Sequence, residues 1–184
     1  DITDAELVTS TIKTFKPDSL IHCAAMAGVR YSIKHPLMYT ETNVLGTQNI
    51  LEAIKKHSLD TKLVLLSSSS IYGVQTTTPF VETMHPSPSS PYGATKLSME
   101  LLAREYANHF TMKIAIVRPF SIYGPRGRVD MAPFLILKAA TQNRPFYQFG
   151  SNDNKRDWTY VGDFADGIVK LVHNWSFSSF EVFN

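Results

Sequence analysis

Short apolar runs alternate with helical stretches along the chain, a pattern typical of a parallel β-sheet whose strands are joined by helices. The clearest strand is 62–67, which is apolar toward both faces, as a central parallel strand is. The strands predicted in this way are 19–24, 62–67, 113–118, 146–149 and 180–184. Amphipathic periodicity predicts helices at 4–15, after Pro36 through about 54, and at 92–108, 131–141 and 164–173. We therefore expect an α/β fold.

Two long connections interrupt this alternation. The first runs from Ser67 to Pro91, and the second runs from Pro119 to Asp130. Loops this long inside a compact domain are uncommon and usually functional. Both follow predicted strands, so their first residues should lie at the carboxyl edge of the sheet, where open α/β sheets bind ligands.

Composition narrows the class of protein. The chain has 184 residues, of which 43% are hydrophobic and 18% charged, and its formal net charge is +2. The sequence has no basic tract, so we do not expect nucleic acid as a partner. No apolar run reaches the ~18 residues that a membrane-spanning helix needs. The single cysteine, Cys23, excludes an internal disulfide framework, and the first residues do not resemble a signal peptide. We expect a soluble, cytoplasmic protein without a metal site.

Tyr92 and Lys96 are the main candidates for chemistry. Four residues apart at the start of a predicted helix, they share one face. A tyrosine has a pKa near 10, and a neighbouring ammonium favours phenolate over phenol, so the pair could accept a proton from an alcohol. The alternative is a solvated helix face, on which Tyr and Lys are common at this spacing.

Serines gather just past the predicted strand 62–67. The run Ser67-Ser68-Ser69-Ser70 leads into Ile71-Tyr72-Gly73, and a serine there could hydrogen-bond a substrate hydroxyl and relay its proton. The alternative is a polar turn. The segment after the predicted strand 113–118, Arg118-Pro-Phe-Ser-Ile-Tyr-Gly-Pro125, also contains small and polar residues. The three strands 19–24, 62–67 and 113–118 would therefore all present small or polar residues at one edge of the sheet.

Several motifs occur together in one order. They are His22-Cys-Ala-Ala25, Ala27-Gly-Val-Arg-Tyr-Ser32, Asn43-Val-Leu-Gly46, Ser67-Ser-Ser-Ser-Ile-Tyr-Gly73, Tyr92-Gly-Ala-Thr-Lys96, Arg118-Pro-Phe-Ser-Ile-Tyr-Gly-Pro125 and Arg156-Asp-Trp-Thr-Tyr160. In this combination the chain resembles the extended short-chain dehydrogenase/reductase family. Within that family it is most similar to the nucleotide-sugar epimerases, the UDP-glucuronate 4-epimerases in particular.

The resemblance implies a Rossmann-type doubly wound parallel sheet with helices on both faces. Residues 1–125 would form a partial NAD-binding domain, and residues 126–184 part of a small substrate-binding lobe with a segment returning to the sheet. The family's glycine-rich turn, which holds the pyrophosphate, is not found in this sequence. We therefore expect the 184 residues to be a fragment of a longer chain, incomplete at its N-terminus and inactive alone.

Roles follow from the same resemblance, position by position. Tyr92 would be the proton acceptor, Lys96 its partner and a ligand of the nicotinamide ribose, and Ser68 the family's catalytic Ser/Thr. The NAD contacts implied are Asp1, Ile2, Ala24, Ala25, Asn43, Tyr92, Lys96 and Pro119. Pro119 stands where phenylalanine is usual in the family, and the alternative for Asn43 is a packing hydrogen bond in place of a contact with NAD. The implied contacts to the sugar and its diphosphate are Ser69, Ser70, Ser121, Arg128 and Arg156.

The serine run also bears on the type of reaction. Related dehydratases place an acidic residue or an Asp-Glu pair after the catalytic Ser/Thr, since elimination of water needs an acid and a base there. Here Ser69 and Ser70 occupy those positions, which favours 4-epimerisation of UDP-glucuronate to UDP-galacturonate through a 4-keto intermediate.

Several alternatives remain open. Among enzymes they are a 4-epimerase for UDP-glucose/UDP-galactose or their N-acetyl forms and, less favoured, a nucleotide-sugar dehydratase. Outside enzymes, the chain could be a silent cofactor-sensing or scaffold protein. We also expect a homodimer, because similar proteins dimerise through the helices that carry Asn43 and Tyr92.

Overall fold

The computed structural model describes residues 1–147, 155–177 and 179–184. The chain divides into two compact units. The first unit comprises residues 1–119 and 174–184, and the second comprises residues 120–173. The second unit is thus an insertion in the chain of the first.

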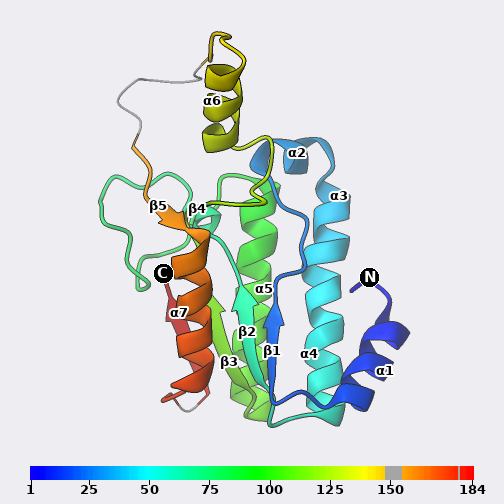
Figure 1. The fold of residues 1–184 in the computed structure, drawn as a ribbon. Coiled ribbons are helices and arrows are strands. Elements are labelled where there is room, and N and C mark those ends of the chain that lie inside the picture. The colour runs from blue at the N-terminus through cyan, green and yellow to red at the C-terminus, as the bar shows by residue number, and fades with distance from the viewer. Residues whose placement is uncertain (148–154, 178) are drawn as a thin grey trace. The chain divides into compact units, whose positions relative to one another are not determined.

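The first unit is built on a four-stranded sheet (Figure 1). Its strands are β1 (Ser19–His22), β2 (Lys62–Leu66), β3 (Lys113–Val117) and β6 (Phe180–Phe183), in the order β1-β2-β3-β6. All neighbouring pairs are parallel. The parallel sheet expected from the hydrophobic pattern is confirmed, and all four carboxyl ends lie at one edge.

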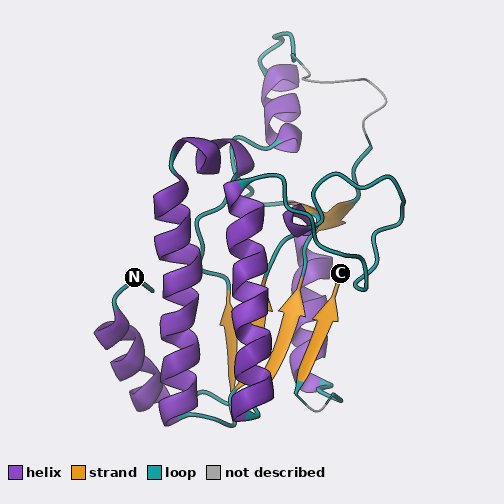
Figure 2. Cartoon of the chain, turned by 180° about the vertical axis from the view of Figure 1, so that it is seen from behind, coloured by secondary structure: helices purple, strands orange, loops and turns teal. Residues whose placement is uncertain are grey.

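Helices of the first unit cover one face of this sheet (Figure 2). They are α1 (Ala5–Phe15), α4 (Gly46–His57) and α5 (Pro91–Phe110). The short helices α2 (Val29–Lys34) and α3 (Pro36–Tyr39) come between β1 and α4 in the chain. Between α3 and α4 the chain forms a π-helical turn at Thr40–Leu45, so the helix predicted after Pro36 is one run with a local widening. A 3₁₀ turn, Ser69–Ile71, follows β2.

Alternation along the strands builds the core. Leu63 and Leu65 of β2 and Ile114 and Ile116 of β3 point to the helix-covered face. Their partners come from α1, α4 and α5: Ile12, Ile50, Leu51, Ala53, Ile54, Met99, Ala103, Tyr106 and Ala107, with Met112 before β3. This apolar layer positions α5 across β2 and β3.

The second unit contains β4 (Ser121–Tyr123) and β5 (Trp158–Tyr160), which pair in parallel, and the helices α6 (Ala132–Thr141) and α7 (Val161–His173). Neither three-residue strand was predicted, because such short strands show no periodicity. The strand predicted at 146–149 is wrong for residues 146 and 147, which are irregular, while 148 and 149 lie outside the described residues.

A search of the described helices for a membrane span finds none that is both long and apolar enough.

Candidate active site

The first turn of α5 lies against the turn that follows β2. Ser90 caps α5 by accepting a hydrogen bond from the Gly93 N–H at 3.1 Å, and Pro91 occupies the first turn. A Cβ at Gly93 would lie 2.5 Å from the carbonyl oxygen of Ser70. Only glycine allows this approach, which holds the first turn of α5, where Tyr92 lies, against the serine run.

The serine run forms a fixed turn. The Ser68 side chain caps the 3₁₀ turn by accepting from the Ser70 N–H at 3.1 Å. The Ser69 N–H donates to the Pro119 carbonyl at 3.0 Å, which joins this turn to the end of β3. Ser68 is buried, whereas Ser69 and Ser70 are half-buried. The structure thus brings Ser68, Ser69, Ser70 and Pro119 together at one edge.

Lys96, one helical turn after Tyr92, is buried beneath that edge and is 4% exposed. Its ammonium donates to the Leu66 carbonyl at 2.8 Å, at the last residue of β2. Burial lowers the pKa of Lys96 to about 8, while negative charge on Cys23 and Glu100 opposes this shift. Burial also raises the pKa of the Cys23 thiol, so at pH 7 the thiol is neutral and Glu100 is the opposing charge.

Tyr92 is half-buried at the start of α5. Its backbone N–H donates to the Ser32 hydroxyl at 3.1 Å, and its ring meets the Tyr39 ring edge-on at 6.1 Å between centroids. The Tyr39 hydroxyl donates to the carbonyls of Ala27 and Gly28. The loop after β1 and the helix that carries Tyr92 are therefore held together.

Asn43 ties the end of β1 to α5. It is fully buried; its side-chain oxygen accepts from the Met26 N–H at 2.7 Å, and its amide donates to the Met26 carbonyl and to the Thr95 hydroxyl. These bonds use both N–H donors of the amide and one lone pair of its oxygen, which favours the packing alternative over direct contact with a ligand. They fix the loop that contains Ala24, which is exposed, and Ala25, which is half-buried.

A second buried contact lies at the end of β1. His22 Nε2 is 3.0 Å from the Thr47 hydroxyl, which anchors β1 to α4. Burial, with a smaller contribution from Lys96, lowers the pKa of His22 to about 4. His22 is therefore a neutral structural group at physiological pH.

Asp1 and Ile2 lie before α1. Asp1 is exposed and accepts from the Thr3 N–H at 2.9 Å, while the Ile2 side chain packs against the core and Gly46. The Asn49 amide holds the Ile2 carbonyl at 3.0 Å. The Ile2 side chain and the Asn49 amide therefore fix this segment.

The remaining predicted residues belong to the second unit. Ser121 opens β4, and its N–H donates to the Asp157 carbonyl. Arg128 is exposed and forms an ion pair with Asp130, and Arg156 is exposed and donates to the Lys155 carbonyl at 2.7 Å. Tyr92 belongs to the first unit.

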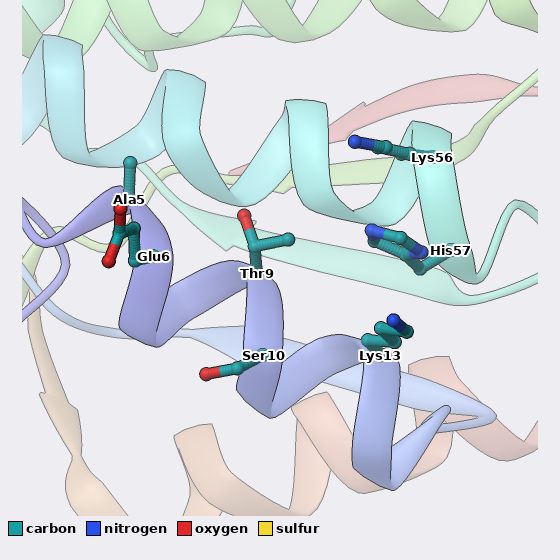
Figure 3. Close-up of a pocket in the computed structure, with 7 residues that line it drawn as sticks. All are labelled: Ala5, Glu6, Thr9, Ser10, Lys13, Lys56 and His57. Atoms are coloured by element: carbon teal, nitrogen blue, oxygen red, sulfur yellow. The ribbon is translucent and has the colours of Figure 1, made fainter.

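A separate hollow of about 450 Å³ lies between α1 and α4 (Figure 3). Lys13, Lys56 and His57 line one end of it, with Glu6 and Thr9 among the other lining residues. The two lysines lie in the last turns of α1 and α4, where a positive charge stabilises the helix dipole. Among the described residues, no cluster of three His, Cys, Asp or Glu side chains could hold a metal ion.

Sequence reasoning missed a buried ionic cluster beneath the edge. Glu100 of α5 pairs with Arg118, with 2.7 Å between Nη2 and Oε2, and accepts a hydrogen bond from the Ser67 hydroxyl. Arg118 also donates to the Tyr72 hydroxyl at 2.8 Å. The signal available in the sequence was the four-residue spacing from Lys96 to Glu100, which a solvated helix face would share.

This parallel sheet with polar groups at its carboxyl edge can be compared with known proteins. A family model described as GDP-mannose 4,6 dehydratase matches residues 1–182. The chain belongs to this family, in which NAD-dependent epimerases and dehydratases are grouped. Membership confirms the resemblance and the Rossmann-like fold that it implied.

Particular relatives are more specific. The chain is 41% identical over 170 residues to a UDP-glucuronate 4-epimerase of Thermodesulfobacterium geofontis, covering 92% of this chain and 52% of the relative. It matches the crystal structure of UDP-glucuronic acid 4-epimerase from Bacillus cereus in complex with UDP-glucuronic acid and NAD, with a TM-score of 0.90 at 35% identity. That match covers 100% of this chain and 57% of the other.

A Thermus thermophilus UDP-glucose 4-epimerase in complex with NAD is also similar, with a TM-score of 0.86 at 30% identity over 99% of this chain and 61% of the other. The chain spans about half the length of the curated relatives it matches.

Acid should destabilise the protein through His22. Its pKa is about 4 when folded and about 6.5 when unfolded, so the unfolded state binds more protons as the pH falls through this window. We expect the free energy of unfolding to drop by about 3 kcal/mol between pH 6.5 and 4 from this group, and His22→Gln to lose that part of the drop. Urea titrations at several pH values measure it. His85→Gln, at an exposed site, should follow the wild type; a His22→Gln curve that also does so would contradict the prediction.

Removal of the Asn43 amide should leave the Met26 N–H and carbonyl without this partner, while the Thr95 hydroxyl keeps only its bond to the Tyr92 carbonyl. We expect Asn43→Ala to lower the free energy of unfolding by about 1–3 kcal/mol, measured by urea denaturation. Asn108→Ala, at the exposed end of α5, is the matched control and should change it by less than about 0.5 kcal/mol. Equal stability of the two variants would refute a packing role for Asn43.

Proposed function

We propose that this chain carries the catalytic edge of an NAD-dependent UDP-glucuronate 4-epimerase. The supporting observation is the close approach of α5 to the serine turn at Gly93, which lies between Tyr92 and the buried Lys96. Relatives named as UDP-glucuronate 4-epimerases, one with UDP-glucuronic acid and NAD bound, support the choice of sugar. Residues 1–125 would supply part of the NAD-binding domain, and residues 126–184 part of the substrate lobe.

The end of β1 suits the cofactor. Ala24 is exposed and Ala25 half-buried, and their small side chains let a dinucleotide approach the backbone beyond the sheet. Lys96 and Tyr92 would hold the nicotinamide ribose, Pro119 would contact the nicotinamide end, and Asp1 and Ile2 the adenine. Asn43 would act indirectly, by fixing the loop that follows β1. When bound there, NAD supplies the hydride acceptor and donor that the reaction needs.

Tyr92 and Ser68 would move the proton. The Lys96 ammonium stabilises a phenolate at Tyr92, which takes the proton of the sugar 4-hydroxyl directly or through the Ser68 hydroxyl. Together with loss of hydride from C4, for which bound NAD would be the acceptor, this proton transfer would leave a 4-keto sugar. After the sugar has rotated in the site, hydride would return to the opposite face of C4, and Tyr92 would give the proton back to the 4-oxygen. The protein supplies orientation and a tuned base.

Five further residues are proposed contacts of the UDP-sugar. Ser69 and Ser70, with Ser121 and Arg128, would bind the sugar and its carboxylate, and Arg156 would grip the diphosphate, which a planar guanidinium can contact at two oxygens. Arg128 already pairs with Asp130, so a carboxylate ligand would have to compete with that ion pair. Arg156 is exposed and donates to the backbone carbonyl of Lys155.

Neutral Ser69 and Ser70 favour epimerisation over dehydration, because neither can act well as acid or base. A UDP-glucose 4-epimerase is the second candidate, favoured by the similar Thermus thermophilus enzyme. We further propose a cytoplasmic location, since a lone cysteine suits a reducing compartment.

The proposed function is tested by incubating the full gene product with UDP-glucuronate and, separately, UDP-glucose, and identifying the products by chromatography. Conversion of UDP-glucuronate to UDP-galacturonate is expected, and exclusive conversion of UDP-glucose would favour the second candidate. Tyr92→Phe should keep its NAD and lose about 10²–10⁴-fold in kcat. Tyr147→Phe, at an exposed tyrosine, should remain active. Near-normal turnover by Tyr92→Phe would remove Tyr92 from its role.

A homodimer through α4 and α5 is a further proposal. Leu45, in the turn that leads into α4, and Leu101 of α5 are each about half exposed, at 48% and 47%, and would be covered by a second copy. Sedimentation should show twice the monomer mass, with Leu101→Glu monomeric. Leu7→Glu, at an equally exposed leucine of α1, should stay dimeric; a monomeric wild type would overturn the proposal.

A further inference from the structure

Glu100 is a buried charge to which the proposed mechanism gives no role. It lies one helical turn after Lys96 on α5 and is 1% exposed. An ionised carboxylate at such a site is tolerated only when it is paired and hydrogen-bonded. Glu100 meets this condition through the Arg118 guanidinium, with nitrogen–oxygen distances of 2.7 and 3.0 Å, and through the Ser67 hydroxyl.

Both partners of Glu100 immediately precede residues of the candidate site. Ser67 is followed by Ser68, and Arg118 by Pro119. The two strand ends are also joined to each other, since the Ser67 N–H donates to the Val117 carbonyl at 2.7 Å. A single carboxylate thus fixes the ends of β2 and β3 at the point where each chain leaves the sheet.

The charge of Glu100 also acts on Lys96. The ionisable groups that interact with Lys96 are His22 and Cys23 from the end of β1 and Glu100 from α5, and Arg118 of the β3 end is paired with Glu100. Tyr92 precedes Lys96 by one helical turn. His22 is neutral above pH 5, and the Cys23 thiol is neutral at pH 7. Glu100 is therefore the negative group that favours the ammonium of Lys96 near neutral pH.

We propose that Glu100 is a positioning residue of the candidate site, which fixes the Ser67–Ser68 turn through the Ser67 hydroxyl and keeps a negative charge one helical turn from Lys96. This proposal rests on the proposed function for its catalytic meaning. Its structural content concerns the chain alone, and so it can be tested without substrate.

The first test is the titration of the Lys96 amine by NMR, in the full gene product labelled with ¹³C at lysine Cε and assigned by the signal lost in Lys96→Arg. Glu100→Gln removes the negative charge and leaves the Arg118 guanidinium uncompensated. We expect the pKa of Lys96 to fall by about one unit in this variant. Glu105→Gln, an exposed site on the same helix, is the matched control and should leave the pKa of Lys96 unchanged. An unchanged pKa in folded Glu100→Gln overturns the proposal.

The second test is the pH dependence of kcat/KM for UDP-glucuronate. Activity should fall as Lys96 loses its proton, so Glu100→Gln should move this alkaline limb to lower pH by about one unit and reduce kcat about tenfold or more. Ser67→Ala, which keeps the charge, should lower kcat several-fold with the limb in place. A role in stability alone would not move the limb.

Glu100→Gln could fail to fold, because it leaves a buried guanidinium without its counter-charge. In that case Ser67→Ala decides: a several-fold loss of kcat at unchanged KM supports the proposal, and wild-type kcat overturns it. If the wild type converts no UDP-sugar, the proposed function fails, while the Lys96 titration still decides whether Glu100 acts on Lys96.

Discussion

Burial of the Lys96 ammonium is the constraint on which the arrangement at the sheet edge depends. A cation that is 4% exposed needs an acceptor and a nearby negative charge, and the structure supplies the Leu66 carbonyl and Glu100. Glu100 in turn requires Arg118 and Ser67. Lys96 thereby holds the end of β2, and Glu100 holds the residues that follow β2 and β3. The partners of the buried charges therefore position the residues around the candidate site. The cost of this burial is visible in the lowered pKa of Lys96.

Hydrophobic periodicity was sufficient to predict most of the sheet. The strands at 19–22, 62–66, 113–117 and 180–183 follow from apolar runs, and α5 follows from its leucine spacing. The short β4 and β5 could not be predicted, because three residues carry no period. The π-helical turn before α4, which contains the buried Asn43, was also missed.

The candidate site was predictable only in part. Tyr92, Lys96 and the serine run could be named because their spacing has a chemical meaning, and the fold does place them near one edge. The buried cluster of Glu100 and Arg118 was not predictable, since pairing across 18 residues depends on how α5 packs on β3. Asn43 is instructive as well: its sequence context suggested a ligand, whereas its three hydrogen bonds give it a role in joining β1 to α5.

The connectivity of the sheet has one more consequence. β3 and β6 are adjacent, hydrogen-bonded strands, yet the chain between them forms the whole second unit. The first unit is thus assembled from two separate stretches of polypeptide, which are joined by the backbone hydrogen bonds between β3 and β6. After a single proteolytic cleavage within the second unit, the two fragments would stay associated through the hydrogen bonds between β3 and β6. Denaturing gel electrophoresis would then show two fragments, whereas size-exclusion chromatography would show one particle of the original size.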